Sequence, residues 1–256
     1  MPHLFIFGLG YSAKRICAAT EALGWRVTAT GSDGDIAFGD EGAVRAALAA
    51  ASHVLSSVPP GAEGDPVLAR YGDAFGGGWL GYLSSTGVYG DTAGAWVDET
   101  APVGSGRRTA RAEADVAWQA RGARVFRLPG IYGPGRSALD RVRDGRAHRI
   151  DLPEQVFSRI HVDDIAAGVV AGLDAPRGVY NLADDLPASQ NAVVEEACRL
   201  LGIAPPPLRP LGEAGLSAQA RAFYGEARRV ANGKAKRGLG WRPRYPDYRS
   251  GLIDCI

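Results

Sequence analysis

The chain has 256 residues, which is long enough for one large domain, or a domain with an appended lobe, around a buried core. Hydrophobic residues make up 46% of it and charged residues 22%, which are ordinary values for a globular protein. The net charge of +1 argues against a dedicated nucleic-acid-binding protein, because such proteins usually carry a clustered basic face.

The three cysteines, Cys17, Cys198 and Cys255, are far apart and form no C-x-x-C pair. This spacing suits a reducing compartment and argues against a disulfide framework or a zinc site, so we predict no metal. We find no secretory signal at the start of the sequence and no stretch near the roughly 20 apolar residues that a membrane span needs. We therefore expect a cytoplasmic protein with no membrane partner.

The first predicted unit is a strand, a glycine-rich turn, a helix and a second strand over residues 4–31. An apolar run at 4–7 breaks into Gly8-Leu9-Gly10-Tyr11-Ser12-Ala13, a helical stretch follows, and an apolar run resumes at 26–30. A G-x-G-x-x-A turn in this context is typical of a dinucleotide-binding fold.

Each small residue of this turn has a physical role in such a site. Gly8 permits the tight turn, Gly10 lets the backbone approach a pyrophosphate, and Ala13 lets the helix pack closely on the strand. The start of the helix then presents unpaired N–H groups and the positive end of its dipole to the phosphates.

Segments with strand and helix character alternate along the rest of the chain, which is the pattern of a parallel sheet with crossover helices. Asp40 and Asp65 are typical N-cap residues, and Pro66 suits the first position of a helix. The predicted strands are 36–38, 53–58, 79–84, 124–128 and 178–182. The predicted helices are 41–51, one that begins at Pro66, 107–120, 163–173, 189–202, 212–224 and 228–239.

The end of the second strand bears on the choice between NAD and NADP. A NAD site usually has an Asp or Glu about 20 residues past the glycines, which holds the ribose 2′-hydroxyl. Here Gly31 and Ser32 stand at that place, so no carboxylate repels a 2′-phosphate and Ser32 could donate to one. Asp33 comes one or two positions later, and a loop shift could bring it in. We predict NADP as the cofactor, with NAD as the alternative.

Four later stretches resemble segments of the extended short-chain dehydrogenases/reductases, the family of nucleotide-sugar epimerases and dehydratases. They are YLSSTGVYG at 82–90, RLPGIYGPGR at 127–136, RIHVDDIA at 159–166 and GVYNLA at 178–183. Their order and spacing fit that family from residue 4 to about residue 184. SVPP at 57–60 and RVANGK at 229–234 are similar to an atypical subgroup whose members are largely of unassigned activity.

The resemblance completes the predicted fold class. We expect an α/β fold, a Rossmann-type doubly wound parallel sheet with a small, mainly helical C-terminal substrate lobe. The NAD(P)-binding domain is expected at 1–131 and 161–184, and the substrate-binding lobe at 132–160 and 185–256. Dimerisation is a habit of the family, so a homodimer is a further expectation.

The resemblance also implies a cofactor site, in which several residues have simpler structural roles as well. Asp40 would serve equally as a helix cap, Ser84 and Ser85 could simply end a buried strand, and His161 could anchor the helix that follows it. The implied cofactor residues are Gly8, Gly10, Tyr11, Ser12, Ala13, Ser32, Asp40, Ser57, Val58, Pro59, Pro60, Ser84, Pro129, Gly130 and Ile131.

The chemistry expected of the family lacks its usual residues here. Family catalysis uses a Tyr-x-x-x-Lys pair, whose matching positions hold Ser105 and Thr109, and no lysine of this chain follows a tyrosine at that spacing. We predict that Ser85 is the surviving catalytic position. The candidate acids are Tyr89, Tyr132 and His161, and the arginines that could supply a positive field are Arg107, Arg108 and Arg111.

These observations leave three functions open. The first is an NADP-dependent oxidoreductase or epimerase-like enzyme with a different proton donor, acting on a small molecule such as a carbonyl compound or a nucleotide sugar. The second is a sensor or regulatory protein that binds NAD(P) without turnover. The third, a nucleic-acid-associated scaffold, is disfavoured by the charge balance. The arginines that could grip an anionic substrate are Arg136, Arg141, Arg143, Arg146 and Arg149.

Overall fold

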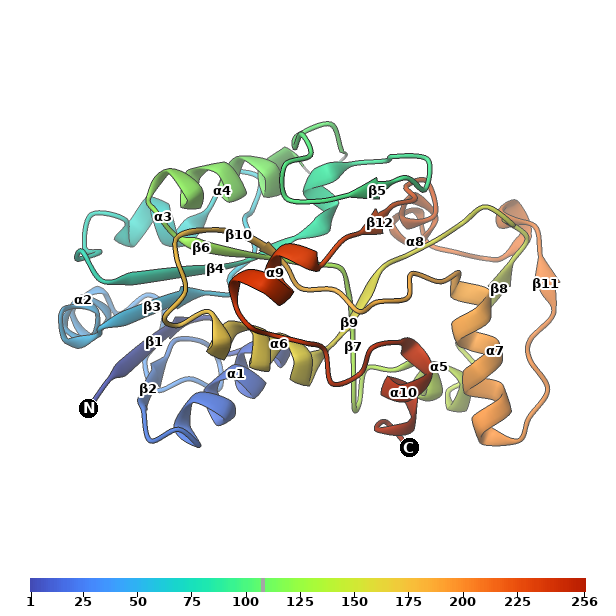
Figure 1. Cartoon of the computed structure of the whole chain (residues 1–256), viewed down its shortest axis with the longest axis horizontal. Coiled ribbons are helices and arrows are strands. Elements are labelled where there is room, and N and C mark those ends of the chain that lie inside the picture. The colour runs from blue at the N-terminus through green and yellow to red at the C-terminus, as the bar shows by residue number, and fades with distance from the viewer. Residues whose placement is uncertain (107–108) are drawn as a thin grey trace.

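The structure is a computed structural model and describes residues 1–106 and 109–256. Its centre is a six-stranded sheet in the order β10-β6-β4-β3-β1-β2, in which every pair of neighbours is parallel (Figure 1). This confirms the predicted doubly wound α/β fold. The strands are β1 (His3–Phe7), β2 (Arg26–Ala29), β3 (His53–Ser56), β4 (Trp79–Ser85), β6 (Arg124–Leu128) and β10 (Gly178–Asn181).

Helices cover both faces of this sheet, and the alternation of side chains in β1 shows why. Leu4 and Ile6 pack on the face covered by α1 and α6, whereas Phe5 and Phe7 pack on the face covered by α2, α3 and α4 (Figure 1). Because both faces are buried, most strand residues are apolar on both faces, as is typical of parallel sheets. These helices are α1 (Tyr11–Glu21), α6 (Val162–Ala171), α2 (Glu41–Ala50), α3 (Pro66–Tyr71) and α4 (Thr109–Ala120).

Two of the predicted helix starts are confirmed by their capping bonds. The Asp40 carboxylate accepts from the N–H of Ala43 at 3.0 Å, at the start of α2. Asp65 accepts from Val67 and Leu68 at 2.9 Å each, and Pro66 is the first residue of α3. Both carboxylates therefore satisfy first-turn N–H groups that have no partner within the helix.

Three of the predicted elements are wrong in part. Residues 36–38 form no strand but a loop with a single bridge from Ile36 to Thr30. The helix predicted over 212–224 is a short 3-10 turn at Leu211–Glu213 and, after a break, α8 (Ala218–Phe223). The helix predicted over 228–239 begins instead as a strand, β12 (Arg229–Val230), and only then forms α9 (Gly233–Gly238).

The last of these errors has a long-range cause. β12 pairs with β5 (Trp96–Val97), a segment more than a hundred residues earlier, and no local sequence pattern encodes that pairing. The prediction of a helix over 107–120 is confirmed from Thr109 onward, while Arg107 and Arg108 lie outside the described residues.

A second cluster of apolar side chains lies at one end of the sheet, at the right of Figure 1. It is formed by α5 (Ala138–Arg143), α7 (Gln190–Leu201) and α10 (Tyr248–Ile253), with β8 (Arg149–Ile150) and β11 (Leu208–Arg209) beside them. At α9 the chain returns to the sheet, where Ala235 of α9 and Trp241, which follows it, join the core of the α1 and α6 face. The expected domain boundaries stay a prediction.

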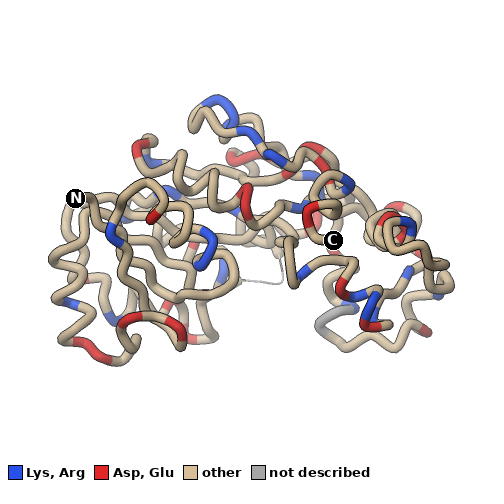
Figure 2. The backbone as a smooth tube through the Cα atoms, turned by 90° about the horizontal axis from the view of Figure 1, so that it is seen from below, with Lys and Arg blue, Asp and Glu red and all other residues tan. Residues whose placement is uncertain are grey.

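Charge is spread evenly over the molecule. Basic and acidic residues are interspersed along the whole tube in Figure 2, as the net charge of +1 leads one to expect. In the described parts of the chain, no helix combines the length and the apolar character that crossing a membrane requires.

A buried ion pair joins helix α4 to strand β6. Arg127 donates to both carboxylate oxygens of Asp115, at 2.7 and 3.0 Å, and the two side chains are 3% and 0% exposed. Ser84 donates to the same carboxylate at 2.5 Å, and Arg127 also donates to the hydroxyl of Tyr89 at 3.0 Å. Tyr89 donates in turn to Asn181 at 2.8 Å, so that the network spans β4, β6 and β10.

We predict that Arg127→Met lowers the free energy of unfolding by about 3–5 kcal/mol, because it leaves the Asp115 carboxylate buried without its counter-charge. Denaturation in urea measures the loss. Arg146, which pairs with Asp144 at the surface with 70% of its side chain exposed, is the matched control. Arg146→Met should cost less than about 1 kcal/mol. Similar losses in the two variants would contradict a structural role for the buried pair.

Candidate functional site

A cavity of about 430 Å³ opens at the carboxyl ends of the central strands. The strand order reverses at β1, since the chain proceeds from β1 to β2 on one side and then to β3, β4, β6 and β10 on the other. Ligands of open α/β sheets bind at such a reversal. The cavity wall includes the glycine turn after β1, Ser57 after β3, the end of β4 and the segment after β6.

The glycine turn is held in place by the ends of two strands. Gly8 has a φ of +83°, and a Cβ on it would lie 3.0 Å from Val58 Cγ2 and 3.1 Å from the Ser57 hydroxyl, so only glycine fits. Its N–H donates to the Thr30 hydroxyl at 3.1 Å, and Ser57 donates to its carbonyl oxygen. Ser57 and Val58 therefore shape the turn from the side of β3.

The start of α1 is built to receive an anion. Gly10 is the N-cap and makes no side-chain capping bond, the first turn carries no acidic residue, and a Cβ at Gly10 would meet nothing within 4 Å. Gly10, Tyr11, Ser12 and Ala13 all line the cavity. The first N–H groups of the helix and its positive end thus face open space, which fits the pyrophosphate of a dinucleotide.

The end of β2 holds an ion pair at the place expected for the adenine ribose. Asp33 pairs with Lys14 from the first turn of α1, and the hydrogen bond from Lys14 lowers the pKa of the Asp33 carboxyl. Ser32 is exposed beside them. Lys14 thus offsets the charge of Asp33, while Asp35, the next carboxylate along, accepts from the N–H of Ala29 at 2.9 Å.

The remaining predicted cofactor residues divide between the cavity wall and its surroundings. Ser84, Pro129, Gly130 and Ile131 line the cavity together with the glycine turn and Ser57. The residues that lie outside the wall of this cavity are Gly8, Ser32, Asp40, Val58, Pro59 and Pro60.

The two serines at the end of β4 have different bonds. The Ser84 hydroxyl is buried and donates to Asp115. Ser85 is half-buried and its oxygen accepts from the N–H of Gly87 at 3.1 Å, as the cap of the 3-10 turn η1 (Thr86–Tyr89). That bond leaves the hydrogen of the Ser85 hydroxyl for a second partner, and the side chain lines the cavity. Ser85 can therefore donate to a bound oxygen, while Ser84 is committed to the core.

The positions of the missing Tyr and Lys do not line the cavity. The Ser105 hydroxyl donates to the carbonyl oxygen of Tyr89 at 3.1 Å, and Thr109 is the first residue of α4. Arg111, two residues further along α4, does lie in the wall, where it donates to the carbonyl oxygen of Leu83 at 3.5 Å. Of the three arginines considered for a positive field, Arg107 and Arg108 lie outside the described residues.

Tyr89 and Tyr132, two of the candidate acids, stand behind the wall. Tyr89 is 2% exposed, bonds Asn181 and Arg127, and has its pKa raised by burial. Tyr132 is 8% exposed, and burial raises the pKa of its hydroxyl strongly. The structure does not bring either hydroxyl into the wall with Ser85, so their role as acids stays a prediction.

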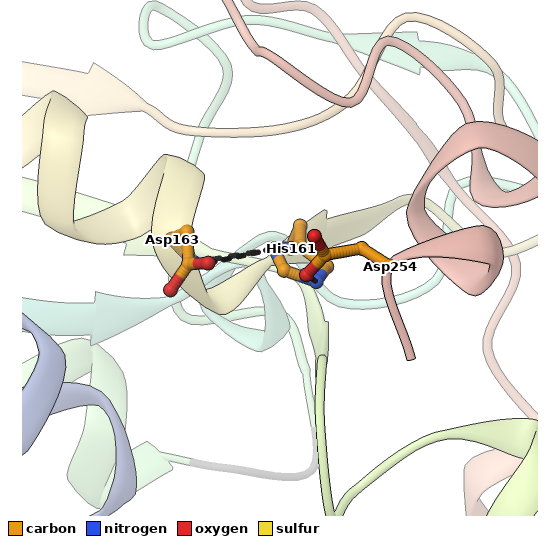
Figure 3. A group of neighbouring side chains, drawn as sticks. All are labelled: His161, Asp163 and Asp254. Atoms are coloured by element: carbon orange, nitrogen blue, oxygen red, sulfur yellow. Dashed lines mark hydrogen bonds and ion pairs between the residues drawn. The ribbon is translucent and has the colours of Figure 1, made fainter. Parts of the chain in front are cut away.

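His161, the third candidate acid, is fully buried between α6 and α10 (Figure 3). Its Nδ1 accepts from the N–H of Asp163 at 3.3 Å, so the neutral ring carries its hydrogen on Nε2. That nitrogen lies 3.6 Å from Asp254 Oδ2 and 4.0 Å from Cys255 Sγ. Burial lowers the pKa of His161. These contacts describe a helix cap that also holds the C-terminal helix, and His161 is not part of the cavity wall.

Sequence reasoning missed the far end of the cavity. Phe157, Ser158, Phe223, Glu226 and Arg228 line it, and all five lie outside the stretches that resemble the family. Arg136 is the one member of the lobe's predicted arginine group in the wall, and its guanidinium lies 5.6 Å from the centre of the Tyr11 ring.

Known proteins resemble this chain in sequence and in structure. The solved structure of a functionally unknown conserved protein from Silicibacter pomeroyi DSS is 40% identical, with a TM-score of 0.87 over 99% of this chain and 97% of that one. Human epimerase family protein SDR39U1, crystallised with NADPH, is 17% identical, with a TM-score of 0.76 over 98% of each chain, and shows the same fold.

One curated relative carries an activity in its name. A 3-diazoavenalumate denitrifying reductase from Streptomyces is 33% identical over 143 residues, which are 50% of this chain and 45% of that protein. The chain spans about half the length of the curated relatives it matches. No family model matches it.

The buried histidine generates a pH prediction. Because burial lowers the pKa of His161 below its ordinary value of 6.5, the unfolded chain takes up this proton more readily than the folded one. The free energy of unfolding should therefore fall as the pH drops below about 6.5. His161→Asn keeps an acceptor for the N–H of Asp163 and removes the titration. Denaturation of both forms at pH 7.5 and 5.5 should show a smaller loss in the variant, and equal losses would contradict the assignment.

Proposed function

We propose that the chain is a member of an atypical subgroup of the extended short-chain dehydrogenase/reductase family and an NADP-dependent oxidoreductase acting on a small carbonyl compound. One observation carries the proposal: a single cavity joins the uncapped start of α1 to the free hydroxyl of Ser85. The first feature suits a dinucleotide, and the second suits the oxygen of a substrate.

The residues of this chain fit a nicotinamide dinucleotide. The pyrophosphate would lie on the N–H groups of Tyr11, Ser12 and Ala13, and the nicotinamide between Ser84 and the segment 129–131. When bound, the cofactor supplies or accepts a hydride at a substrate carbon. Related folds crystallised with NADPH or NAD support the assignment.

The charges near the end of β2 favour NADP over NAD. Lys14 neutralises Asp33, so a 2′-phosphate would meet a lysine and the Ser32 hydroxyl rather than an unpaired carboxylate. Phosphate oxygens bind well to such a set of donors. NAD remains the alternative, with Asp33 accepting from the 2′-hydroxyl.

Ser85 and Arg111 would act on the substrate. Ser85 would donate to the carbonyl oxygen and hold it, and the charge of Arg111 would stabilise the negative charge that develops on that oxygen. Because arginine side chains do not deprotonate in proteins, the proton that the substrate oxygen takes up must come from another group or from solvent. The residues 132–160 and 185–256 would form the substrate-binding lobe. The word reductase in the name of the Streptomyces relative supports redox chemistry rather than epimerisation.

A second candidate function is NAD(P) binding without turnover, as a sensor or regulatory protein. The observation that favours it is that Ser105 and Thr109, which hold the positions of the family's tyrosine and lysine, do not line the cavity. The unpaired state of the three cysteines suits a cytoplasmic location for either function.

Replacing Ser85 separates these two functions. If Ser85 holds the substrate oxygen, Ser85→Ala should lower kcat about 100-fold without changing the Kd for NADPH. Absorbance of NADPH measures turnover with a panel of carbonyl compounds, and fluorescence titration measures the Kd. Ser189→Ala, which removes the cap of the distant helix α7, should lose about 1 kcal/mol of stability and keep its kcat. NADPH binding without turnover on any substrate would favour the sensor.

The choice of cofactor is tested at Ser32. Ser32→Asp places a carboxylate beside the proposed 2′-phosphate and should raise the Kd for NADPH about tenfold more than the Kd for NADH. Ser32→Ala, which removes only the hydroxyl, should change the ratio of the two constants less. Fluorescence titration with both dinucleotides measures them, and equal changes in the aspartate variant would refute this placement.

A further inference from the structure

The end of the cavity away from the glycine turn has an aromatic wall, formed by Phe157 and Phe223. The centres of the two rings are 4.1 Å apart and their planes differ by 23°. Phe157 is 9% exposed, whereas Phe223, on α8, is 40% exposed. An exposed phenyl ring in a cavity is unfavourable in water and favourable once another apolar surface covers it.

The aromatic wall is held from behind. The N–H of Phe157 donates to Ala188 at 3.0 Å, and the Arg159 guanidinium lies 5.9 Å from its ring centre. Tyr224 packs on Phe157 with ring centres 5.9 Å apart, and its hydroxyl lies 2.9 Å from His148 Nε2. The Phe157 ring is therefore fixed by its packing neighbours, so the aromatic wall is an ordered surface.

Among the described residues, three charged side chains lie beside the aromatic wall, and all of them are engaged. Arg159 is buried and donates to the carbonyl oxygens of Phe157 and Ala188, while Arg228 and Glu226 cancel each other's charge. Arg228 pairs with Glu226, and its guanidinium also donates to the carbonyl oxygens of Gly90 at 2.7 Å and Thr86 at 3.2 Å. The side chains of the pair are 13% and 10% exposed. A guanidinium with its donors engaged in this way offers little to a further anion.

The other arginines of the lobe do not form an anion-binding site at this end of the cavity either. Arg143, Arg146 and Arg149 pair with carboxylates of the lobe, Arg141 lies outside the cavity wall, and Arg136 lies at the glycine turn, over Tyr11. A diphosphate carries at least two negative charges, which buried sites meet with several cations. The described residues at the aromatic wall therefore suit a flat ligand of low charge better than a nucleotide sugar.

We propose that the substrate is a planar aromatic carbonyl compound without phosphate groups, with its ring on the aromatic wall and its carbonyl oxygen at Ser85. The proposal rests on the oxidoreductase function proposed above. In the reduction, the carbonyl carbon takes a hydride from NADPH and the oxygen takes a proton from solvent, which gives an alcohol and NADP⁺.

The test compares two aldehydes of equal carbon number, planar benzaldehyde and puckered cyclohexanecarbaldehyde, with UDP-glucose as a third compound. The full-length wild type and Phe223→Leu are first titrated with NADPH, and then assayed for KM and kcat. The melting temperature of each NADPH complex is measured with each compound as a readout independent of turnover. Trp96→Leu is the matched control, since Trp96 is 59% exposed and lies outside the cavity wall.

The wild type should show a KM for benzaldehyde about three- to tenfold below that for the cyclohexane analogue, and Phe223→Leu should remove this preference without changing the Kd for NADPH. Trp96→Leu should keep it. Equal KM values for the two aldehydes, or a preference for UDP-glucose, would overturn the substrate class. The substrate class would also be overturned if the protein binds NADPH but benzaldehyde is neither turned over nor shifts the melting temperature. Cofactor binding would still stand in that case. Failure to bind NADPH would instead overturn the proposed function and this inference with it.

Discussion

The ion pair between Arg127 and Asp115 is the interaction on which the centre of this molecule depends. Both side chains are almost fully buried, so each would be costly without the other, and each needs further partners for its remaining hydrogen-bonding groups. Those partners come from β4 and the turn that follows it. They are Ser84 of β4 and Tyr89 of η1, which extends the network to Asn181 of β10. The pair thereby fixes the register of helix α4 against the strands whose ends form the cavity.

The same network decides which polar groups remain for chemistry. Ser84 and Tyr89 resemble family site residues, yet their hydroxyls are engaged with Asp115, Arg127 and Asn181. Both hydroxyls form hydrogen bonds to the buried ion pair. If either hydroxyl bound a substrate instead, a buried polar group would lose its partner. The network does not use Ser85, one residue further on, which lines the cavity. We therefore assign the proposed substrate-binding hydroxyl to Ser85 and not to either engaged neighbour.

Sequence reasoning succeeded where the determinants are local and failed where they are distant. The glycine turn, the caps at Asp40 and Asp65 and the apolar strands depend on neighbours in the chain, and the structure has them as predicted. The strand at 229–230 depends on a partner at 96–97, which no local pattern reveals. For the same reason the motifs made Tyr132 and His161 candidate acids but did not reveal that neither residue lines the cavity. The aromatic wall could not be predicted from the sequence, because Phe223 lies on α8 and the extent of that helix was predicted wrongly.

The two ends of the cavity differ in electrostatic potential, and this difference would determine where each ligand binds. At one end the uncapped start of α1 and the Arg136 guanidinium present positive charge. At the other end the charges of Glu226 and Arg228 cancel beside an aromatic surface. The positive charge at the first end stabilises a bound anionic dinucleotide, and the aromatic surface at the second end stabilises an apolar ring. Electrostatics and burial would therefore direct each ligand to its own end of the cavity. Ser85 lines the same cavity, and in the proposed function it marks the place where the nicotinamide and the carbonyl group would meet.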